Sequence, residues 1–188
     1  TNTSSNFSNV EFVIVDGTLE ISKRTVTLTS ADDEKVYDGK ALTNDEVTVS
    51  GNGFATGEGA TYDVTGTQTN VGSSANAFTY TLNDGTKAAN YTITTTEGTL
   101  TVTELTDKVT VTITENSGTE KYDGSEKTVT GYTVSIDNEL YTEADFTFSG
   151  DATVKGTDAG TYNMELKAAD FTNTSSNFSN VEFVIVDG

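Results

Sequence analysis

The stretch TNTSSNFSNVEFVIVDG, Thr172–Gly188, repeats letter for letter the first stretch of the chain, Thr1–Gly17. One copy starts at position 1 and the other at position 172, so the period of the repeat is about 170 residues. This period is longer than that of a short solenoid repeat, so it counts whole domains. We therefore expect the chain to be a segment of a tandem array in which identical units follow one another.

A weaker similarity divides the period into two halves. The sequence EKVYDG of Glu34–Gly39 recurs as EKYDG in Glu120–Gly124. The other matching pairs are Asn70–Gly72 with Asp158–Gly160, Phe78–Leu82 with Tyr162–Leu166, Asn90–Ile93 with Asn177–Asn180, and Glu97–Val102 with Asp16–Ile21. The unit therefore consists of two related domains of about 85 residues each.

These matches set the expected domain boundaries. Residues 1–21 are predicted to be the terminal strands of a preceding repeat, with Val10–Val15 and Thr18–Ile21 as the strands. A first β-domain follows over residues 22–104 and a second over residues 105–188. The last strand of the second domain, the equivalent of Thr18–Ile21, is expected to lie beyond Gly188.

The chain is predicted to be all-β, because about one residue in five is Thr, often alternating with Val, Ile, Leu or Tyr. The predicted strands are Thr25–Thr29, Glu46–Ser50, Ala60–Thr65, Ala77–Asn83, Tyr91–Thr95, Thr99–Thr103, Lys108–Thr114, Gly131–Ile136, Asp145–Ser149, Gly160–Ala168 and Val181–Val186. Capping-box patterns at residues 43–46 and 142–145 predict two short helical turns. We expect an elongated tandem array of small antiparallel β-sandwiches of immunoglobulin-like character, with a β-grasp-like sheet carrying a helical turn as the alternative.

Composition excludes several kinds of chemistry. The chain has no Cys, His, Trp or Pro, so it forms no disulfide and offers no His base, Cys nucleophile or Cys/His metal site. The formal net charge of −19 disfavours binding to nucleic acid and to anionic lipid. No apolar run reaches the roughly 20 residues that span a bilayer, so no membrane insertion is expected. No carboxylate pair stands out among the 29 acidic residues, and we predict that the protein is not an enzyme.

The Tyr-Asp-Gly motif is the strongest local signal, at Tyr37, Asp38 and Gly39 and again at Tyr122, Asp123 and Gly124. We interpret it as a turn in which Gly has a positive φ, Asp bonds the nearby backbone and Tyr buries its ring. A carbohydrate or calcium contact is the functional alternative.

Several motifs together resemble a known family: Lys35–Gly39, Asn70–Gly72, Lys87–Ile93 and Gly98–Val102 in the first domain, and Tyr122–Gly124 and Gly160–Tyr162 in the second. The chain resembles the YDG and MBG modules found in long tandem arrays on bacterial surface proteins and adhesins. The resemblance implies an extracellular spacer attached to the bacterial cell surface, and it implies no catalytic residue.

The sequence also contains candidates for two further kinds of site. The acidic clusters Ala31–Glu34 and Asn83–Gly85 offer oxygen ligands for calcium but lack the spacing of a calcium loop, so no cofactor is expected. An amide cross-link between Lys and Asn is the second, because a buried Lys that loses its proton becomes a nucleophile. The equivalent candidate pairs are Lys35 with Asn90 and Lys121 with Asn177.

The preferred function is a structural one, a stiff acidic spacer in an extracellular stalk or fibre. Its partners are identical neighbouring repeats joined end to end, with strand complementation by Val10–Val15 of one unit as a variant. The alternative is an adhesive module that binds a host glycan or protein through loop aromatics, for which Tyr62, Tyr132 and Tyr141 are the candidates.

Overall fold

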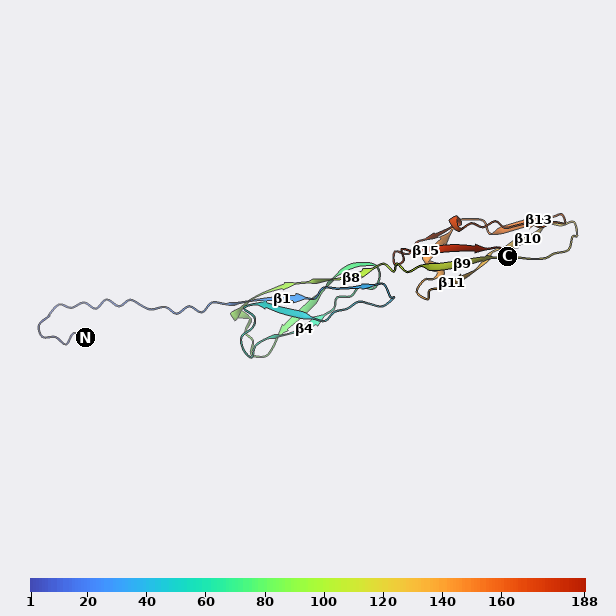
Figure 1. Ribbon diagram of the computed structural model, residues 1–188. Helices are drawn as coiled ribbons and strands as arrows, with labels where there is room; N and C mark the ends of the chain where they lie inside the picture. The colour runs from blue at the N-terminus through green and yellow to red at the C-terminus, as the bar shows by residue number, and fades with distance from the viewer.

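The computed structural model describes all residues from 1 to 188. The folded part consists of two narrow lobes that lie end to end (Figure 1). Strands β1 to β8 build the first lobe and strands β9 to β15 build the second. Residues 1–23 form no helix or strand and extend away from the first lobe, on the side opposite the second lobe.

The first lobe contains three small sheets. Its elements are β1 (Arg24–Ser30), β2 (Asp33–Val36), β3 (Val47–Gly51), β4 (Ala60–Val64), β5 (Gly72–Asn76), β6 (Phe78–Leu82), the 3-10 turn η1 (Ala88–Asn90), β7 (Tyr91–Thr96) and β8 (Gly98–Thr103). The strand orders are β3-β1-β7, β2-β8-β5 and β4-β6.

The second lobe also contains three small sheets. Its elements are β9 (Val109–Glu115), β10 (Lys127–Thr130), β11 (Tyr132–Ile136), η2 (Glu143–Asp145), β12 (Phe146–Phe148), β13 (Thr153–Gly156), η3 (Ala168–Asp170), β14 (Phe171–Asn173) and β15 (Val181–Val186). The strand orders are β11-β9-β15, β10-β13 and β12-β14.

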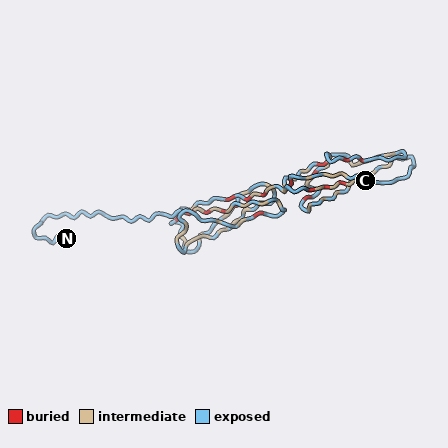
Figure 2. The backbone as a smooth tube through the Cα atoms, in the orientation of Figure 1, coloured by how far each residue is buried: buried red, intermediate tan, exposed pale blue.

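Alternation along the first strand of each lobe places apolar side chains on one face, as the period of a strand requires. Val26 and Leu28 of β1 are fully buried, as are Val109, Val111 and Ile113 of β9. In Figure 2 the buried positions form a thin line along both lobes, and the N-terminal segment is exposed throughout. The second lobe has the larger core, in which Tyr141, Phe146, Phe171 and Phe178 join these strands.

Two long parallel arms run through the first lobe. One arm is β1 followed by β2, and the other is β7 followed by β8. Arg24 pairs with Tyr91 at one end and Asp33 with Leu100 further along, so the offset in sequence number between partners is the same in both halves of the ladder. The register therefore continues across the short interruptions between β1 and β2 and between β7 and β8, although the two halves belong to different sheets.

A buried polar cluster holds the two arms together at that interruption. The Ser30 hydroxyl donates to the Asn76 carbonyl oxygen (2.6 Å) and accepts from the Gly98 N–H (2.9 Å). The Asn76 side-chain amide donates to the carbonyl oxygens of Ala31 and Asn44 at 3.0 and 2.8 Å. These bonds satisfy backbone groups where the ladder breaks, which is a requirement for burying them.

The prediction of an all-β chain is confirmed, but the prediction of purely antiparallel sheets is wrong. The pairs β1 with β7, β2 with β8, and β9 with β15 are parallel. In each lobe the first strand lies between an antiparallel neighbour and a parallel strand from the end of the lobe. This mixed pairing is compatible with the β-grasp-like alternative, which stays a prediction, and only 3-10 turns and no long helix accompany it.

Most predicted strands are present, and the exceptions have physical reasons. Val10–Val15, Thr18–Ile21 and Gly160–Ala168 are not strands, because no neighbouring strand lies beside them to form a ladder. The strands β2, β5, β10, β13 and β14 were not predicted, since they are short and rich in polar or small residues. The helical turn at residues 142–145 is confirmed as η2, with its capping box. The turn at residues 43–46 is not helical, because the Asn44 side chain accepts the Glu46 N–H instead.

The structure also corrects one internal match. Tyr91 pairs with Arg24 at the start of the first lobe, and Val181 pairs with Val109 at the start of the second. The equivalent of Asn90 is therefore Asn180, not Asn177. The sequence carries a signal for this alignment, because the spacing from Asn90 to Gly98 equals the spacing from Asn180 to Gly188.

Candidate functional site: the joint between the lobes

The connection between β8 and β9 is held against the second lobe. Leu105 forms a parallel bridge with Phe178. In this bridge the Leu105 N–H donates to the Asn177 carbonyl oxygen (2.9 Å) and the Ser179 N–H donates to the Leu105 carbonyl oxygen (3.3 Å). The connection therefore continues the strand pairing of the second lobe and does not behave as a free linker.

Tyr37 of the first Tyr-Asp-Gly motif extends from the first lobe into the second. Its ring meets the Phe178 ring edge to face, with centroids 5.5 Å apart and planes at 76°. Phe178 in turn meets Tyr141 edge to face at 5.0 Å. The Tyr37 N–H donates to the Thr103 carbonyl oxygen (2.9 Å), which fixes the backbone of the motif at the end of β8. The ring contacts the cores of both lobes and so joins them.

Asn177 forms a polar contact beside these rings. Its side-chain oxygen accepts the Val71 N–H (2.8 Å) and its side-chain nitrogen donates to the Asn70 side-chain oxygen (3.2 Å). Both bonds connect the second lobe to the first. On the first lobe the contact is made by the Asn-Val-Gly motif of residues 70–72.

Both Tyr-Asp-Gly motifs are turns in which the Asp carboxylate accepts the backbone N–H two residues further on and the ammonium of a nearby lysine. Gly39 and Gly124 have φ angles of 74° and 79°, which glycine adopts without a steric penalty. The Asp38 carboxylate accepts the Lys40 N–H (2.9 Å) and the Lys35 ammonium (2.6 Å). The Asp123 carboxylate accepts the Ser125 N–H (2.9 Å) and the Lys127 ammonium (2.7 Å).

These bonds lower the pKa of both carboxyl groups, because they stabilise the charged form. The hydrogen bond from Lys35, followed by that from the Lys40 backbone, lowers the pKa of Asp38 below its ordinary value. The hydrogen bonds from Lys127 and Ser125 lower the pKa of Asp123 to about 2. Both carboxylates are therefore charged at neutral pH and bound within their own turns.

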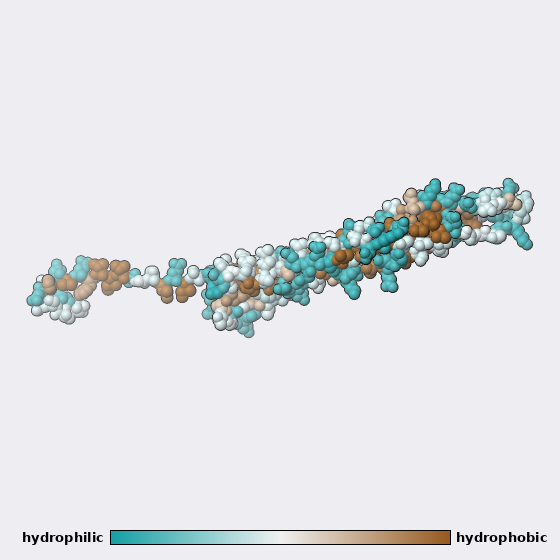
Figure 3. Space-filling model, in the orientation of Figure 1, coloured by the Kyte–Doolittle hydropathy of each residue, from teal (hydrophilic) through white to brown (hydrophobic).

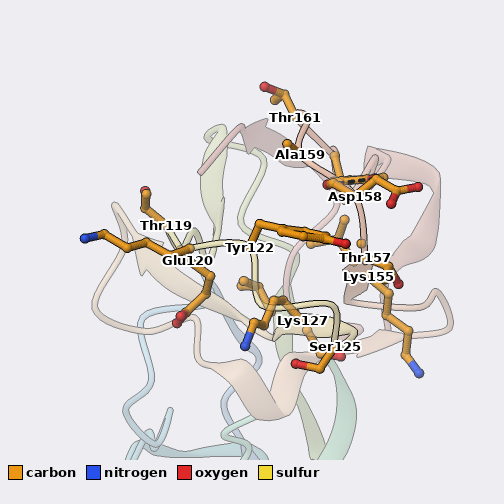
Figure 4. Close-up of a pocket in the computed structure, with 18 residues that line it drawn as sticks. Thr119, Glu120, Tyr122, Ser125, Lys127, Lys155, Thr157, Asp158, Ala159 and Thr161 are labelled. Carbon is orange, nitrogen blue, oxygen red and sulfur yellow. Dashed lines mark hydrogen bonds between the residues drawn. The ribbon is translucent and has the colours of Figure 1, made fainter.

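The second motif differs from the first in the position of its tyrosine. Tyr122 is 69% exposed and packs against no other lobe. It borders a groove of about 490 Å³, lined on one side by residues 118–122 and on the other by residues 157–162. Figure 4 shows the Tyr122 ring reaching across this groove toward Thr157.

The cross-link candidates are not brought together in pairs. The Lys35 ammonium bonds the Asp38 carboxylate and the Lys40 carbonyl oxygen, and the Asn90 side chain is exposed. Lys121 is exposed, while the Asn177 side chain bonds residues of the first lobe. The structure records no contact within either pair.

The acidic residues considered for calcium form structural hydrogen bonds. Asp32 accepts the Thr99 N–H (2.7 Å), and Asp33 accepts the Asn44 side-chain amide (3.0 Å). Asn83 lies in a backbone turn with Thr86, in which Gly85 has a φ angle of 89°. No group of three or more Asp or Glu side chains is arranged to hold a metal ion.

Of the three aromatic residues named as candidates for adhesion, one is buried and two are half-buried. Tyr141 is only 2% exposed, and burial raises its pKa to about 12. Tyr132 meets Phe148 and Phe171 edge to face, and Tyr62 packs against the core of the first lobe. Tyr141 is therefore not an exposed loop aromatic, whereas Tyr62 and Tyr132 lie on strands and are half-buried. Sequence alone did not separate core tyrosines from exposed ones, because both alternate with polar residues.

Comparison with known proteins gives one match. The family model of the MBG domain matches residues 109–188, which cover β9 to β15. No curated protein and no solved structure matches the chain. The match lies on the second lobe, whereas most of the motifs that resemble YDG and MBG modules are in the first. None of the helical turns is long and apolar enough to cross a membrane.

Proposed function

We propose that the chain is a structural repeat unit of an extracellular bacterial stalk or fibre, in which it acts as a stiff acidic spacer. The match of residues 109–188 to the MBG domain model supports this proposal. MBG domains occur in surface proteins, which supports a place on the bacterial cell surface. The proposal includes no cofactor and no catalytic residue. Its partners are identical repeats at each end.

The joint between the lobes is the observation that carries this proposal. Tyr37 and Asn177 each make a contact between the two lobes, and Leu105 holds the connection against the second lobe. Bending the joint would break the Asn177 bonds and expose the paired rings, so these contacts resist it. A spacer must keep its ends apart, and a joint of this kind keeps two modules in line.

The surface charge fits the same role. A net charge of −19 repels identical neighbours and keeps a long exposed fibre from associating sideways. The exact repetition of Thr1–Gly17 as Thr172–Gly188 supports an array in which this two-lobe unit recurs. The net negative charge and the exact sequence repeat together favour a spacer in an array over an isolated domain.

Double electron–electron resonance tests the stiffness directly. The chain has no Cys, so spin labels attach only where they are placed. We expect a narrow distance distribution for the full chain labelled at Asp63→Cys and Ser135→Cys, one exposed site on each lobe. Labels at Val13→Cys and Asp63→Cys provide a comparison, because residues 1–23 make no backbone hydrogen bond to the lobes and should give a broad distribution. A distribution between the lobes as broad as this comparison would overturn the proposal.

A further inference from the structure

The turn after β3 contains Asn52 and Gly53, which form the only Asn-Gly pair of the chain. Asn52 closes the ladder at the start of β1 with three hydrogen bonds to Thr25. The Asn52 N–H donates to the Thr25 carbonyl oxygen (2.8 Å). The Asn52 side-chain oxygen accepts both the N–H and the hydroxyl of Thr25, at 3.1 and 3.0 Å. Two donors therefore hold the side-chain carbonyl group in place.

The second lobe has a carboxylate at the equivalent position. Asp137 directly follows β11 as Asn52 directly follows β3, and the interval from Thr110 to Asp137 equals the interval from Thr25 to Asn52. The Asp137 carboxylate accepts the Thr110 N–H (2.8 Å), and the Asp137 N–H donates to the Thr110 carbonyl oxygen (3.2 Å). The same place in the fold therefore accommodates an amide in one lobe and a carboxylate in the other.

The Asn-Gly pair has the groups for an intramolecular reaction. The backbone nitrogen that follows an Asn attacks the side-chain amide carbon and closes a five-membered succinimide ring, and glycine hinders this attack least because it has no Cβ. Neither the Gly53 N–H nor the Asn52 side-chain nitrogen makes a hydrogen bond in the structure. The nucleophile and the leaving group are therefore both free to react.

Arg24 stabilises the nucleophile. Its guanidinium group donates to the backbone carbonyl oxygen of Asn52 and, through Nε, to that of Gly53 (2.9 Å). When the Gly53 nitrogen loses its proton, the negative charge is shared with the Asn52 carbonyl oxygen of the same peptide group. A charge-assisted hydrogen bond to that oxygen therefore favours the deprotonated, nucleophilic form.

Thr25 stabilises the charge that develops during the attack. Addition of the nitrogen to the amide carbon places negative charge on the Asn52 side-chain oxygen. This oxygen already accepts the N–H and the hydroxyl of Thr25. Two donors directed at a developing oxyanion are the arrangement of an oxyanion hole.

We propose that Asn52 and Gly53 form a self-modification site, at which the folded first lobe converts Asn52 into Asp or isoaspartate without an enzyme. The bond from the Gly53 nitrogen to the Asn52 amide carbon forms, and the bond from that carbon to the side-chain nitrogen breaks. The side-chain nitrogen takes up the proton that the Gly53 N–H loses and leaves as ammonia. Water then opens the succinimide, at its side-chain carbonyl to give Asp or at its backbone carbonyl to give isoaspartate.

The surroundings suit both the second step and its product. Asn52 is exposed, and the visible face of the first lobe is mostly white and teal in Figure 3, so water has access to a turn on this surface. The product has a carboxylate beside Arg24, as expected from the Arg24 bonds to this turn. Each conversion adds one negative charge to the net charge of −19. This chemistry goes beyond the proposed spacer and does not depend on it.

Peptide mapping by mass spectrometry measures the rate of conversion. The full chain is incubated in mildly alkaline buffer, folded or unfolded in urea, and the conversion of Asn52 is followed over time. Asn90 serves as a reference in the same digest, because it is exposed but is followed by Tyr91. We expect Asn52 to react faster in the folded chain than in urea, and Asn90 to react more slowly than Asn52 in both. A slower reaction of Asn52 in the folded chain would mean that the fold protects the amide, and it would overturn the proposal.

Two substitutions test the assigned groups. Thr25→Val removes the hydroxyl and keeps the N–H, and Arg24→Met removes the guanidinium. We expect each to slow the reaction at Asn52 in the folded chain by at least about threefold and to leave the rate in urea unchanged. Lys23→Met is the matched control, because Lys23 is an exposed neighbouring cation that makes no hydrogen bond to the turn. Folded-state rates unchanged by both Thr25→Val and Arg24→Met, or lowered equally by Lys23→Met, would overturn the proposal.

Discussion

Tyr37 of the first lobe and Phe178 of the second meet edge to face across the joint, with ring centroids 5.5 Å apart. The Tyr37 ring contacts the cores of both lobes, and Phe178 belongs to the large core of the second. Each ring thus has neighbours in its own lobe that hold it in position. The joint is therefore an extension of two packed cores, and its stiffness depends on aromatic packing.

Replacing Tyr37 by Ala should loosen the joint. The change removes the ring that contacts both lobes, so we expect the distance distribution between labels at Asp63→Cys and Ser135→Cys to broaden. The free energy of unfolding of the second lobe should fall by about 1–3 kcal/mol, the range for losing a partly buried aromatic contact. Urea denaturation followed by tyrosine fluorescence measures this second effect.

Tyr122→Ala is the matched control for Tyr37→Ala. It changes the same residue of the second Tyr-Asp-Gly motif, where the ring is 69% exposed. We expect no change in the distance distribution. The free energy of unfolding should change by less than about 0.5 kcal/mol, as for other exposed side chains. Equal effects of the two substitutions would show that the motif acts only as a turn and does not join the lobes.

Asn177→Ala should weaken the joint through its polar contacts. The substitution removes the acceptor of the Val71 N–H and the donor to Asn70. Losing these bonds costs about 1–2 kcal/mol where the freed group stays partly buried. The duplicated sequence provides the control, because Asn6 occupies the same position in the first copy of the repeated stretch and is exposed. Asn6→Ala should leave both stability and the distance distribution unchanged, and a similar loss from both would contradict the assigned contact.

Gly98→Ala should destabilise the first lobe strongly. Its Cβ would overlap the backbone oxygens of Ser30 and Ala31, where the two arms are held together. Inserting an atom into a packed backbone site costs about 1–3 kcal/mol or more, because neither arm can move without breaking the ladder. Gly17 has the same Asp/Glu-Gly-Thr-Leu surroundings in sequence, yet no atom lies within 4 Å of its Cβ position. Thermal unfolding should show a lowered Tm for Gly98→Ala and an unchanged Tm for Gly17→Ala.

The strands in which apolar residues alternate strictly with Thr could be predicted from the sequence. In β1 and β9 apolar residues alternate with Thr, and the structure buries those apolar residues as predicted. The strand β2 (DEKV) carries three charged residues and becomes a strand only because β8 lies beside it. Pairing between segments as distant in the chain as β1 and β7 leaves no local pattern, so the parallel arms could not be predicted from the sequence.

The sequence indicates the motifs that form the joint but not the contacts between them. The motifs at residues 37–39 and 70–72 both recur in the second half of the sequence, and the structure brings both into contact with the second lobe. Nothing in the sequence pairs Tyr37 with Phe178, because the chain has eight Tyr and nine Phe. The groove of the second lobe could not be predicted from the sequence either, because it depends on which segments lie beside one another.

Intact-mass spectrometry tests the amide cross-link. Each bond between Lys and Asn would release one ammonia, and we expect none to be lost. The Lys35 ammonium bonds the Asp38 carboxylate and the Lys40 carbonyl oxygen, and no contact joins it to Asn90. The Asn177 side chain bonds the first lobe and lies away from Lys121. A mass below the sequence value by one or two ammonias would contradict this expectation and return the pairs Lys35–Asn90 and Lys121–Asn177 to consideration.

Acid should open the second Tyr-Asp-Gly turn only at very low pH. Hydrogen bonds from Lys127 and Ser125 lower the pKa of Asp123 from 3.8 to about 2 in the folded chain. A carboxyl group whose pKa is lower when folded stabilises the fold above its unfolded pKa, and this stabilisation is lost as the pH falls toward the folded value. We therefore expect the turn to be intact at pH 4 and to lose its bonds as the pH approaches 2.

NMR titration of the Asp123 carboxyl carbon measures that midpoint, and Asp38 serves as an internal comparison because the Lys35 bond lowers its pKa as well. Replacing Lys127 by Met removes the largest cause of the shift and should raise the Asp123 midpoint toward 3.8 while leaving Asp38 unchanged. If the Asp123 midpoint stays near 2 in that variant, the ammonium contact is not what holds the turn. The Ser125 bonds would then account for the geometry by themselves, and Ser125→Ala rather than Lys127→Met would move the midpoint.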